Sequence, residues 1–397
     1  MGMKLLKPRA LLSFITSNKW MRAGYGKSLR EHLSSKYNPT LLIDFANNKI
    51  FDSATVLVNI LSLEKSENEG CTISCSVEDG FDVSKLSDYV QTRAVLSSFF
   101  SSESWSILSD IERSIKAKIE AIGTPLKDWD IQINYGIKTG FNDAFIIDSA
   151  KRDEILGACQ SEDERLRTDE IIRPILRGRD IKRFSYEWAE QYIIATFPSR
   201  QYNIDDYPTL KEFLLSFGIE RLEQTGKEYT IDGEKVKARK KTNNKWFETQ
   251  DSINYWDEFS KPKIIYPNMT KFLPFVYDTS GLVTNQKCFI ITGERLAFLT
   301  AFLNSSLFKF CFADKFPELQ GKTRELSKIF MDEIPVMEVS DEDEARFVML
   351  VEATQKNISK EKLLEIDNAL FDLYQLTEEE REYIGFIDFG DMQSLVQ

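Results

Sequence analysis

The sequence has 397 residues, which is enough for two or three domains with separate hydrophobic cores. Its composition is that of a globular protein, with 42% hydrophobic and 29% charged residues, and no apolar run is long enough to span a membrane. The net charge of −12 argues against a nucleic-acid partner unless positive charge is concentrated locally, and the single histidine, His32, excludes sites that need several histidines.

The five cysteines are scattered, and Cys71 and Cys75 lack the second Cys or His pair that a zinc site requires. We therefore expect no metal site. The start of the sequence, MGMKLLKPRALLSFIT, is basic and then apolar, but it has no small-residue cleavage site and its apolar stretch is short for a signal sequence. These features predict a protein of the bacterial cytoplasm, where thiols stay reduced.

Residues 1–80 have the pattern of an α/β domain. We expect a helix at 25–36 and strands, the first of them buried, at 10–16, 41–46, 54–65 and 71–77. The region contains no G-x-G-x-x-G motif, no P-loop and no acidic residue at the end of a first strand. It therefore has the character of the rear half of a domain whose front half lies elsewhere, and we expect an exposed apolar patch where the absent elements would pack.

Three further regions follow along the chain. Residues 81–128 are predicted to be a mainly helical connector, with a helix at 104–123 that ends before Pro125. A mixed α+β domain is expected over 129–337, and the apolar run 294–313 predicts a long core helix within it. The tail, 338–397, is predicted to be helical and amphipathic.

A polar loop with two glycines opens the α+β domain. The stretch INYGIKTGFNDAFIID, residues 133–148, predicts strands at 131–135 and 144–147 on either side of Gly136 and Gly140. One interpretation is a surface hairpin with ordinary turn residues. The other is that the donors and acceptors of the loop, Lys138, Thr139 and Asn142, face a bound partner.

The negative charge is concentrated at the C-terminal end. Residues 338–397 contain 16 acidic and five basic residues, a net charge of −11, so the first 337 residues are nearly neutral. Within them, residues 173–183 have five basic residues against one acidic, and residues 227–245 have seven against three. Such runs form either solvated faces or surfaces for a polyanion, and local charge matters most because salt screens distant charges.

Several stretches resemble one family in the family's own order. LLKPRALLSFITSNKWMRAGYGKSLREHL and LIDFANNKIFDSATVLVNILSLEK resemble the second half of the catalytic domain of adenine-specific (N6) DNA methyltransferases of the TaqI-like and type IIG restriction–modification group. GIKTGFNDAFIID, IIRPILRGRDIKRF, FSKPKIIYPNM and AFLNSSLFKFCF resemble the target-recognition (specificity) domain of that group. The resemblance implies a partial Rossmann-like methyltransferase segment, an α+β target-recognition domain and a helical C-terminal tail.

The resemblance also shows what the sequence lacks. In that family, S-adenosylmethionine binds to a glycine-containing loop, and catalysis uses an Asn-Pro-Pro-Tyr motif; neither is present. We therefore expect no catalytic residue and no cofactor in this chain, with S-adenosylmethionine belonging to the complete enzyme. By resemblance, Phe51 matches the aromatic residue that stacks on the flipped adenine, although a residue in the core would also be apolar here.

Double-stranded DNA is the partner that the resemblance implies, and the basic runs supply candidate contacts. Arg177 and Arg179 can form forked hydrogen bonds to guanine or phosphate, and Asp180 is expected to hold one of them in place rather than contact a cytosine. Lys138 and Thr139 would contact phosphate, while the glycines let the backbone approach the DNA. The full set of predicted DNA-binding residues is Lys138, Thr139, Gly140, Asn142, Arg173, Arg177, Gly178, Arg179, Asp180, Lys182, Arg183, Lys237, Arg239, Lys240, Lys241 and Lys245.

These observations predict a sequence-specific DNA-recognition module of a methyltransferase or restriction–modification enzyme, catalytically incomplete in this chain. Two alternatives remain: a folded, non-functional fragment of a decayed gene, or a specificity subunit for a separate catalytic methyltransferase or nuclease chain. The acidic tail is expected to form a helical cap, with mimicry of DNA or docking of a partner as the other possibility.

Overall fold

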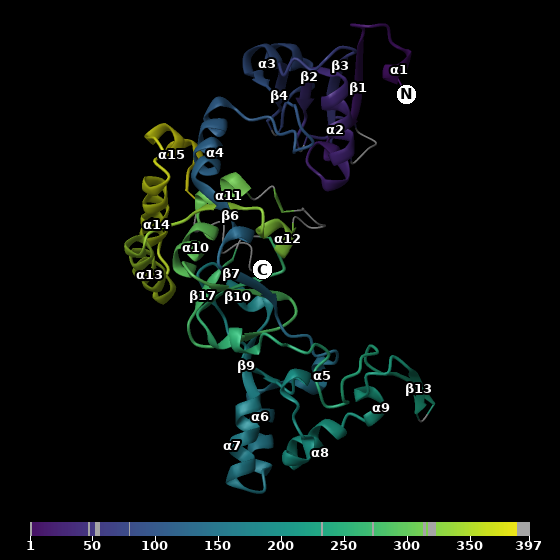
Figure 1. Ribbon diagram of the computed structural model, residues 1–397, viewed down its shortest axis with the longest axis vertical. Helices are drawn as coiled ribbons and strands as arrows, with labels where there is room; N and C mark the ends of the chain where they lie inside the picture. The colour runs from purple at the N-terminus through teal and green to yellow at the C-terminus, as the bar shows by residue number, and fades with distance from the viewer. Residues whose placement is uncertain are drawn as a thin grey trace. The chain divides into compact units, whose positions relative to one another are not determined.

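The computed structural model describes residues 2–46, 48–51, 56–78, 80–231, 233–271, 274–312, 315–316 and 323–386. The chain divides into two compact units, residues 1–117 and 118–397, and each is described by itself. Helix α4 (Asp110–Ile122) contains the point of division (Figure 1). Within the described residues, none of the helices is long and apolar enough to cross a membrane.

The first unit is built on a twisted sheet in the order β1-β3-β2-β4-β5. Strand β4 runs parallel to β2, whereas β3 is antiparallel to both β1 and β2, and β5 is antiparallel to β4. The strands are β1 (Leu11–Ser17), β2 (Asn38–Asp44), β3 (Val58–Glu64), β4 (Thr72–Ser76) and β5 (Val95–Ser97). The helices are α1 (Gly2–Leu5), η1 (Asn18–Met21), η2 (Gly24–Gly26), α2 (Lys27–Lys36), η3 (Val83–Lys85) and α3 (Leu86–Arg93).

Helices cover both faces of this sheet. On one face, Leu33 of α2 packs with Leu42, Leu61 and Trp105. On the other face, residues of α3 pack against Ile43 and its neighbours. The strands expected in this region are present, but β5 lies in a segment that we expected to be mainly helical.

The first strand was predicted to be buried, and this is wrong. Among the described residues, β1 pairs with β3 alone, so it forms an edge of the sheet. Its side chains Leu11, Phe14 and Ile15 are each more than half exposed, at 59%, 53% and 54%. An apolar run of this length predicts a strand, but the run alone does not say whether a neighbour covers it.

The second unit contains two main sheets, in the orders β18-β9-β12-β8 and β17-β15-β19-β7, and the short pairs β10-β11, β13-β14, β16-β20 and β21-β6. Its strands are β6 (Gly123–Pro125), β7 (Ile131–Tyr135), β8 (Ile146–Asp148), β9 (Ile172–Leu176), β10 (Ile181–Lys182), β11 (Ser185–Tyr186), β12 (Gln191–Ile194), β13 (Glu228–Ile231), β14 (Glu234–Lys237), β15 (Lys263–Pro267), β16 (Met269–Thr270), β17 (Val276–Asp278), β18 (Val283–Thr284), β19 (Cys288–Gly293), β20 (Arg324–Glu325) and β21 (Pro335–Met337).

The helices of the second unit are η4 (Leu126–Asp128), α5 (Asn142–Phe145), α6 (Ser149–Ala158), α7 (Glu162–Ile171), η5 (Gly178–Asp180), η6 (Pro198–Arg200), η7 (Ile204–Asp206), α8 (Pro208–Leu215), α9 (Ile219–Leu222), η8 (Trp256–Ser260), α10 (Leu296–Leu303), α11 (Ser306–Phe312), α12 (Lys328–Met331), α13 (Asp341–Lys356), α14 (Lys360–Leu373) and α15 (Glu378–Ile384). A shared core joins the two main sheets, because Ile175 and Ile193 of one contact the cluster that contains Ile265 and Ile290 of the other. Side chains of α6 and α8 cover the other face of the first of these sheets.

The long helix expected at 294–313 is instead two helices, α10 and α11, with a break at Asn304. The Asn304 side chain accepts a hydrogen bond from the Phe275 amide and donates to the Phe275 carbonyl. Asp367 accepts hydrogen bonds from the amide and hydroxyl of Ser306, which begins α11. An asparagine that bonds to the backbone just before β17 ends a helix that apolar periodicity alone would continue.

The C-terminal helices pack on this helical layer. Figure 1 shows α13 and α14, in yellow, side by side. The Glu344 carboxylate of α13 accepts hydrogen bonds from the amides of Ala297 and Phe298 at the N-terminus of α10, where a negative charge is favourable. Leu363, Ile366 and Leu370 of α14 are buried. The described part of the acidic tail, residues 338–386, therefore packs within the second unit.

A buried ion pair connects the β15 and β17 strands. The Lys263 ammonium lies 2.5 Å from the Asp278 carboxylate and also donates to the Phe259 carbonyl. Both side chains are almost fully buried, and burial lowers the pKa of Lys263. The pair therefore satisfies two charges that water cannot reach.

We predict that Lys263→Met lowers the free energy of unfolding by about 3–5 kcal/mol, because the buried Asp278 carboxylate would lose its cationic partner. The control is Lys261→Met, which removes a lysine two residues away that is 57% exposed and pairs with Glu258 at the surface. Its cost should be about 1 kcal/mol or less. Urea titrations followed by tryptophan fluorescence measure both, and equal effects would contradict the role given to the buried pair.

Candidate functional site

A turn that carries two arginines follows β9 in the second unit. The Arg177 side chain donates to both oxygens of Asp180, at 2.9 Å from Nε and 2.7 Å from Nη2, and the Arg177 amide donates to the same carboxylate. These hydrogen bonds raise the pKa of Arg177. Asp180 is 5% exposed, so its charge is committed to Arg177. The carboxylate thus fixes both the turn and the direction of one arginine.

This turn forms one wall of a cleft of about 600 Å³. The lining residues are Arg177, Gly178, Arg179, Ile181, Lys182, Pro267, Met269, Thr270, Lys271, Asn285, Lys287 and Thr323. Five of them are cationic and none of the described lining residues is acidic. A concave surface with this charge favours an anionic ligand, since its field is focused where the charges converge.

Arg179 is the exposed arginine of the turn, and no ion pair joins it to another described residue. Between the two arginines, a Cβ atom at Gly178 would lie 3.1 Å from the Lys287 carbonyl oxygen, so the turn packs closely on that segment. Lys287, which belongs to that segment, and Lys271 are both exposed and line the same cleft as Arg179. Sequence reasoning missed these two lysines because each stands alone between apolar strands and no charge run marks it.

The glycine-containing loop that follows β7 contacts the protein's own backbone. A Cβ atom at Gly136 would lie 1.9 Å from the Asn285 carbonyl oxygen, and Ile137 forms a β-bridge with Asn285. Gly140 has a φ of +79°, and a Cβ atom there would lie 2.9 Å from Gln250 Oε1. These glycines let the loop approach neighbouring segments of the same unit. The expected second strand begins only at Ile146, after the helical turn α5.

Arg239 fixes the other side of this loop. Its guanidinium group donates to the carbonyls of Leu222 (2.8 Å), Thr139 (2.9 Å), Glu248 (2.7 Å) and Trp246 (2.5 Å). Arg239 is only 4% exposed, and burial lowers its pKa to about 10, so it remains charged at neutral pH. Hydrogen bonds to one buried guanidinium group therefore hold four backbone segments together.

The structure buries four of the residues that we predicted to contact DNA. Besides Arg239, these are Thr139, Asp180 and Arg183, with exposures of 2%, 5% and 4%. The Arg183 Nε and Nη2 atoms donate to the Asn304 carbonyl, and burial lowers the pKa of this arginine to about 10. A run of basic residues does not reveal which members point inward, so these four are removed from the candidate surface.

The remaining predicted residues reach solvent to different degrees. Those that are exposed are Gly140, Asn142, Arg179, Lys237, Lys240, Lys241 and Lys245. Those that are partly buried are Lys138, Arg173, Arg177, Gly178 and Lys182. Of the exposed lysines, Lys237 ends β14, and Lys240, Lys241 and Lys245 follow it. Because Lys227 and Lys235 are exposed as well, the second basic run retains six solvent-facing cations after Arg239 is excluded.

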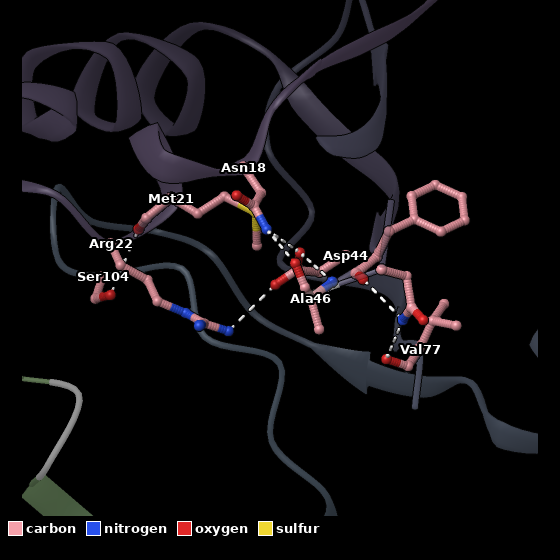
Figure 2. A network of polar contacts seen from close by, with 9 residues as sticks. Asn18, Met21, Arg22, Asp44, Ala46, Val77 and Ser104 are labelled. Carbon is pink, nitrogen blue, oxygen red and sulfur yellow. Dashed lines mark hydrogen bonds and ion pairs between the residues drawn. The ribbon is translucent and has the colours of Figure 1, made fainter. Parts of the chain in front are cut away.

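The first unit has its own polar network where β1 and β2 end. Figure 2 shows Asn18 and Arg22 directed at the carboxylate of Asp44. Asp44 Oδ1 accepts from Asn18 Nδ2 at 2.8 Å and from the Ala46 amide at 3.0 Å, while Asp44 Oδ2 lies 3.2 Å from Arg22 Nη2. Asp44 is 1% exposed. This carboxylate is consequently occupied by groups of the chain itself.

The same network fixes the loop that leads to Phe51. Asn48 Nδ2 donates to the carbonyls of Phe45, Val77 and Glu78, and Asn48 Oδ1 accepts from the Gly80 amide. Phe51 is 44% exposed, which excludes the alternative that it is a core residue. Residues 52–55, which follow it, lie outside the described part of the chain.

The described residues contain no group of three or more His, Cys, Asp and Glu side chains that could hold a metal ion. S-adenosylmethionine, the cofactor of the related methyltransferases, would find no free carboxylate at Asp44, where β2 of the first unit ends. Its ribose hydroxyls need an acidic acceptor at a strand end, and the Asp44 carboxylate there is already engaged with Asn18, Arg22 and Ala46.

Two parts of this chain match known protein families. Residues 173–336 match the TaqI-like C-terminal specificity domain, and residues 1–51 match the Eco57I restriction-modification methylase. The first match contains the arginine turn and every residue that lines the cleft. The cleft therefore lies within the part of the chain that is similar to a specificity domain.

The chain also resembles whole proteins. It is 22% identical to the Type II methyltransferase M.BstVI of Geobacillus stearothermophilus, over 96% of this chain and 67% of that protein. It is 21% identical to the Type II methyltransferase M.PaeR7I of Pseudomonas aeruginosa, over 94% of this chain and 63% of that protein. The chain thus spans about two thirds of the length of these curated relatives.

Among solved structures, the Type IIL restriction-modification enzyme MmeI in complex with DNA has a TM-score of 0.50 and 10% identity. The match covers 98% of this chain and 49% of that one. The mixed α/β fold accordingly resembles that of this restriction-modification enzyme, and the sequence is similar to the two type II methyltransferases.

We predict that Arg239→Lys lowers the free energy of unfolding by about 2–4 kcal/mol, because an ammonium group cannot reach all four buried carbonyls. The control is the opposite exchange at the exposed neighbour, Lys240→Arg, which should change stability by less than about 0.5 kcal/mol. Chemical denaturation provides the energies, and limited proteolysis should show faster cleavage within residues 219–250 of the Arg239→Lys variant alone. Unchanged stability and cleavage would show that these backbone positions are held together by other contacts.

Proposed function

We propose that residues 118–397 recognise a specific double-stranded DNA sequence for a restriction–modification methyltransferase. The observation that carries this proposal is the cationic cleft beside Arg179, within the part that matches a specificity domain. A chain with a net charge of −12 gains little attraction to DNA from its total charge. A cleft lined by five cations and no acidic side chain among its described residues supplies that attraction locally.

Within the cleft, the proposed roles follow from geometry. Arg179 is exposed and unpaired among the described residues, so its planar fork is free to bond to guanine O6 and N7. Arg177 is held by Asp180, whose carboxylate compensates its charge, so its main role is to fix the turn that carries Arg179. Lys271 and Lys287, which act as point charges on flexible stems, suit phosphate oxygens.

The exposed lysines near β14 have a different proposed role. Lys237, Lys240, Lys241 and Lys245 face solvent, and their ammonium groups would neutralise phosphates without reading the sequence. Lys138 is partly buried, and its positive charge lies close enough to Asp251 to lower that carboxyl's pKa, although burial raises that pKa overall. We therefore place the main sequence-independent attraction on the four exposed lysines.

The first unit is proposed to be the rear half of a methyltransferase domain that acts on adenine. Phe51, exposed on a loop fixed by Asn48, suits the base-stacking role that the resemblance assigns to it. Methyl transfer would require a cofactor pocket from another polypeptide segment, because Asp44 is engaged and the sequence has no Asn-Pro-Pro-Tyr motif. On this account the chain selects the site and does not perform the chemistry alone.

Two alternative functions predict different behaviour in binding and activity assays. A specificity subunit would bind DNA alone and regain methylation only with a separate catalytic chain. A fragment of a decayed gene would fold without selecting a DNA sequence. The proposed recognition module and a specificity subunit would both bind DNA with sequence preference, whereas a fragment of a decayed gene would not.

We predict that Arg179→Ala costs about 1–3 kcal/mol of binding free energy on the preferred site and relaxes base preference, because a bidentate base contact would be lost. The comparison variant, Lys240→Ala with Lys241→Ala, should weaken binding to all sequences alike. It should also lower the slope of log affinity against log salt by about one unit per lost phosphate contact.

Fluorescence anisotropy at several salt concentrations, with the selected site and a randomised duplex pool, measures both effects. Equal losses on site and pool for both variants would reject the assignment of base reading to Arg179. Absence of binding by the unaltered protein at low salt would favour the reading as a non-functional fragment.

A further inference from the structure

One face of helix α13 is exposed to solvent within the described part of the chain. The helix packs on α10 and α14, and its buried residues Phe347, Val351 and Thr354 lie on one side of it. Met349 lies on the opposite side and is 66% exposed. A single exposed methionine is ordinary, so the residues around it decide whether this face has a partner.

The residues around Met349 are arranged symmetrically about it. Ala345 and Ala353 lie four residues before and after it, and Glu342 and Lys356 lie seven residues before and after it; all four are exposed. Positions four and seven residues apart share one face of an α-helix. α13 therefore presents a strip with a thioether in the middle, a methyl group on each side and opposite charges at the two ends.

This strip is complementary to a second copy of itself. In an antiparallel pair with a two-fold axis at Met349, Glu342 of one copy lies beside Lys356 of the other, and the contact occurs twice. The small side chains of Ala345 and Ala353 would let the two helix axes approach to about 8 Å. A parallel pair would instead place each charge beside its own copy, so like charges oppose that arrangement.

The charges at the ends of the strip are available for these contacts. Among the described residues, neither Glu342 nor Lys356 forms an ion pair. Arg346 and Glu352 lie at the margins of the strip, about 60° from Met349 around the helix, and stay in contact with water. Arg346 could pair with Glu342 within one helix, but exposed pairs of that kind contribute little and would not prevent an intermolecular contact.

Helix α7 shows that exposure alone does not create such a strip. Its Leu166 is 49% exposed and lies four residues after Glu162 and four residues before Glu170. The same antiparallel pairing about Leu166 would place Glu162 beside Glu170 twice, so that face repels a copy of itself. The charge pattern therefore distinguishes α13 as a surface for self-association.

We propose that α13 is the interface through which two copies of this chain form an antiparallel, two-fold symmetric dimer. One helix pair buries less area than a standard protein interface, so the dimer is weak and its population depends on concentration. The net charge of −12 on each copy opposes association at long range, and physiological salt screens this repulsion. The proposal does not depend on recognition of DNA.

Sedimentation equilibrium of the full chain tests the interface, at about 0.15 M salt, where distant charges are screened. The average mass should rise from 45.9 kDa towards twice that value between about 5 and 500 μM, a range suited to a small interface. Met349→Lys should keep the chain monomeric, because two ammonium groups would meet at the two-fold axis. The matched control, Leu166→Lys on α7, should associate like the unaltered chain.

Exchange of the end charges tests the antiparallel register. Glu342→Lys alone and Lys356→Glu alone each place like charges together, so each variant should remain monomeric. An equimolar mixture of the two variants should recover the dimer, because every end contact then joins a lysine to a glutamate. Recovery on mixing cannot arise from a change in folding, since neither variant refolds the other.

Three results would overturn the proposal. The first is an unaltered chain that stays monomeric up to the highest concentration. The second is a mixture of the two charge variants that is no heavier than either variant alone. The third is a dimer that survives Met349→Lys, including one that Ile15→Lys dissociates, since the copies would then meet at the exposed strand β1 instead of α13.

Discussion

The arrangement of the candidate site depends on the burial of one cation, Arg239, among four backbone carbonyls. A guanidinium group removed from water is tolerated only when its donors are satisfied, so the segments that supply the carbonyls cannot separate without a large cost. One of these segments is the glycine-containing loop, through Thr139. The same loop bonds to Asn285 on the wall of the cleft. The loop therefore connects the wall of the cleft to the segment that carries the exposed lysines near β14.

Each basic run contains both structural and solvent-facing cations. In the run 173–183, Arg183 bonds to the end of α10 and Arg177 is paired with Asp180, which leaves Arg179 and Lys182 on the cleft for a ligand. In the run 227–245, Arg239 is structural and the neighbouring lysines face solvent. Counting charges along the sequence therefore overestimates the cations available to DNA. It also omits Lys271 and Lys287, which the fold brings to the cleft from other strands.

The sequence allowed the order of elements and the family to be predicted, because apolar periodicity and the motifs are local in the chain. It did not allow burial to be predicted where burial depends on distant partners. Gly136 was interpreted as a point of approach to DNA, whereas its neighbour is the Asn285 carbonyl. The break at Asn304 depends on Phe275, and the exposure of β1 depends on a neighbour that the described residues do not provide. Such contacts join positions far apart in sequence, and no local sequence pattern predicts them.

The most direct test of the account is a lysine footprint of the intact chain with and without duplex DNA at low salt. An amine-reactive reagent and mass spectrometry would report the modification of each lysine. The account predicts that DNA protects Lys182, Lys271 and Lys287 in the cleft, while Lys356 and Lys360, exposed on the acidic C-terminal helices, react as before. Equal protection of both groups, or protection of the C-terminal lysines alone, would contradict the claim that the cleft contacts DNA.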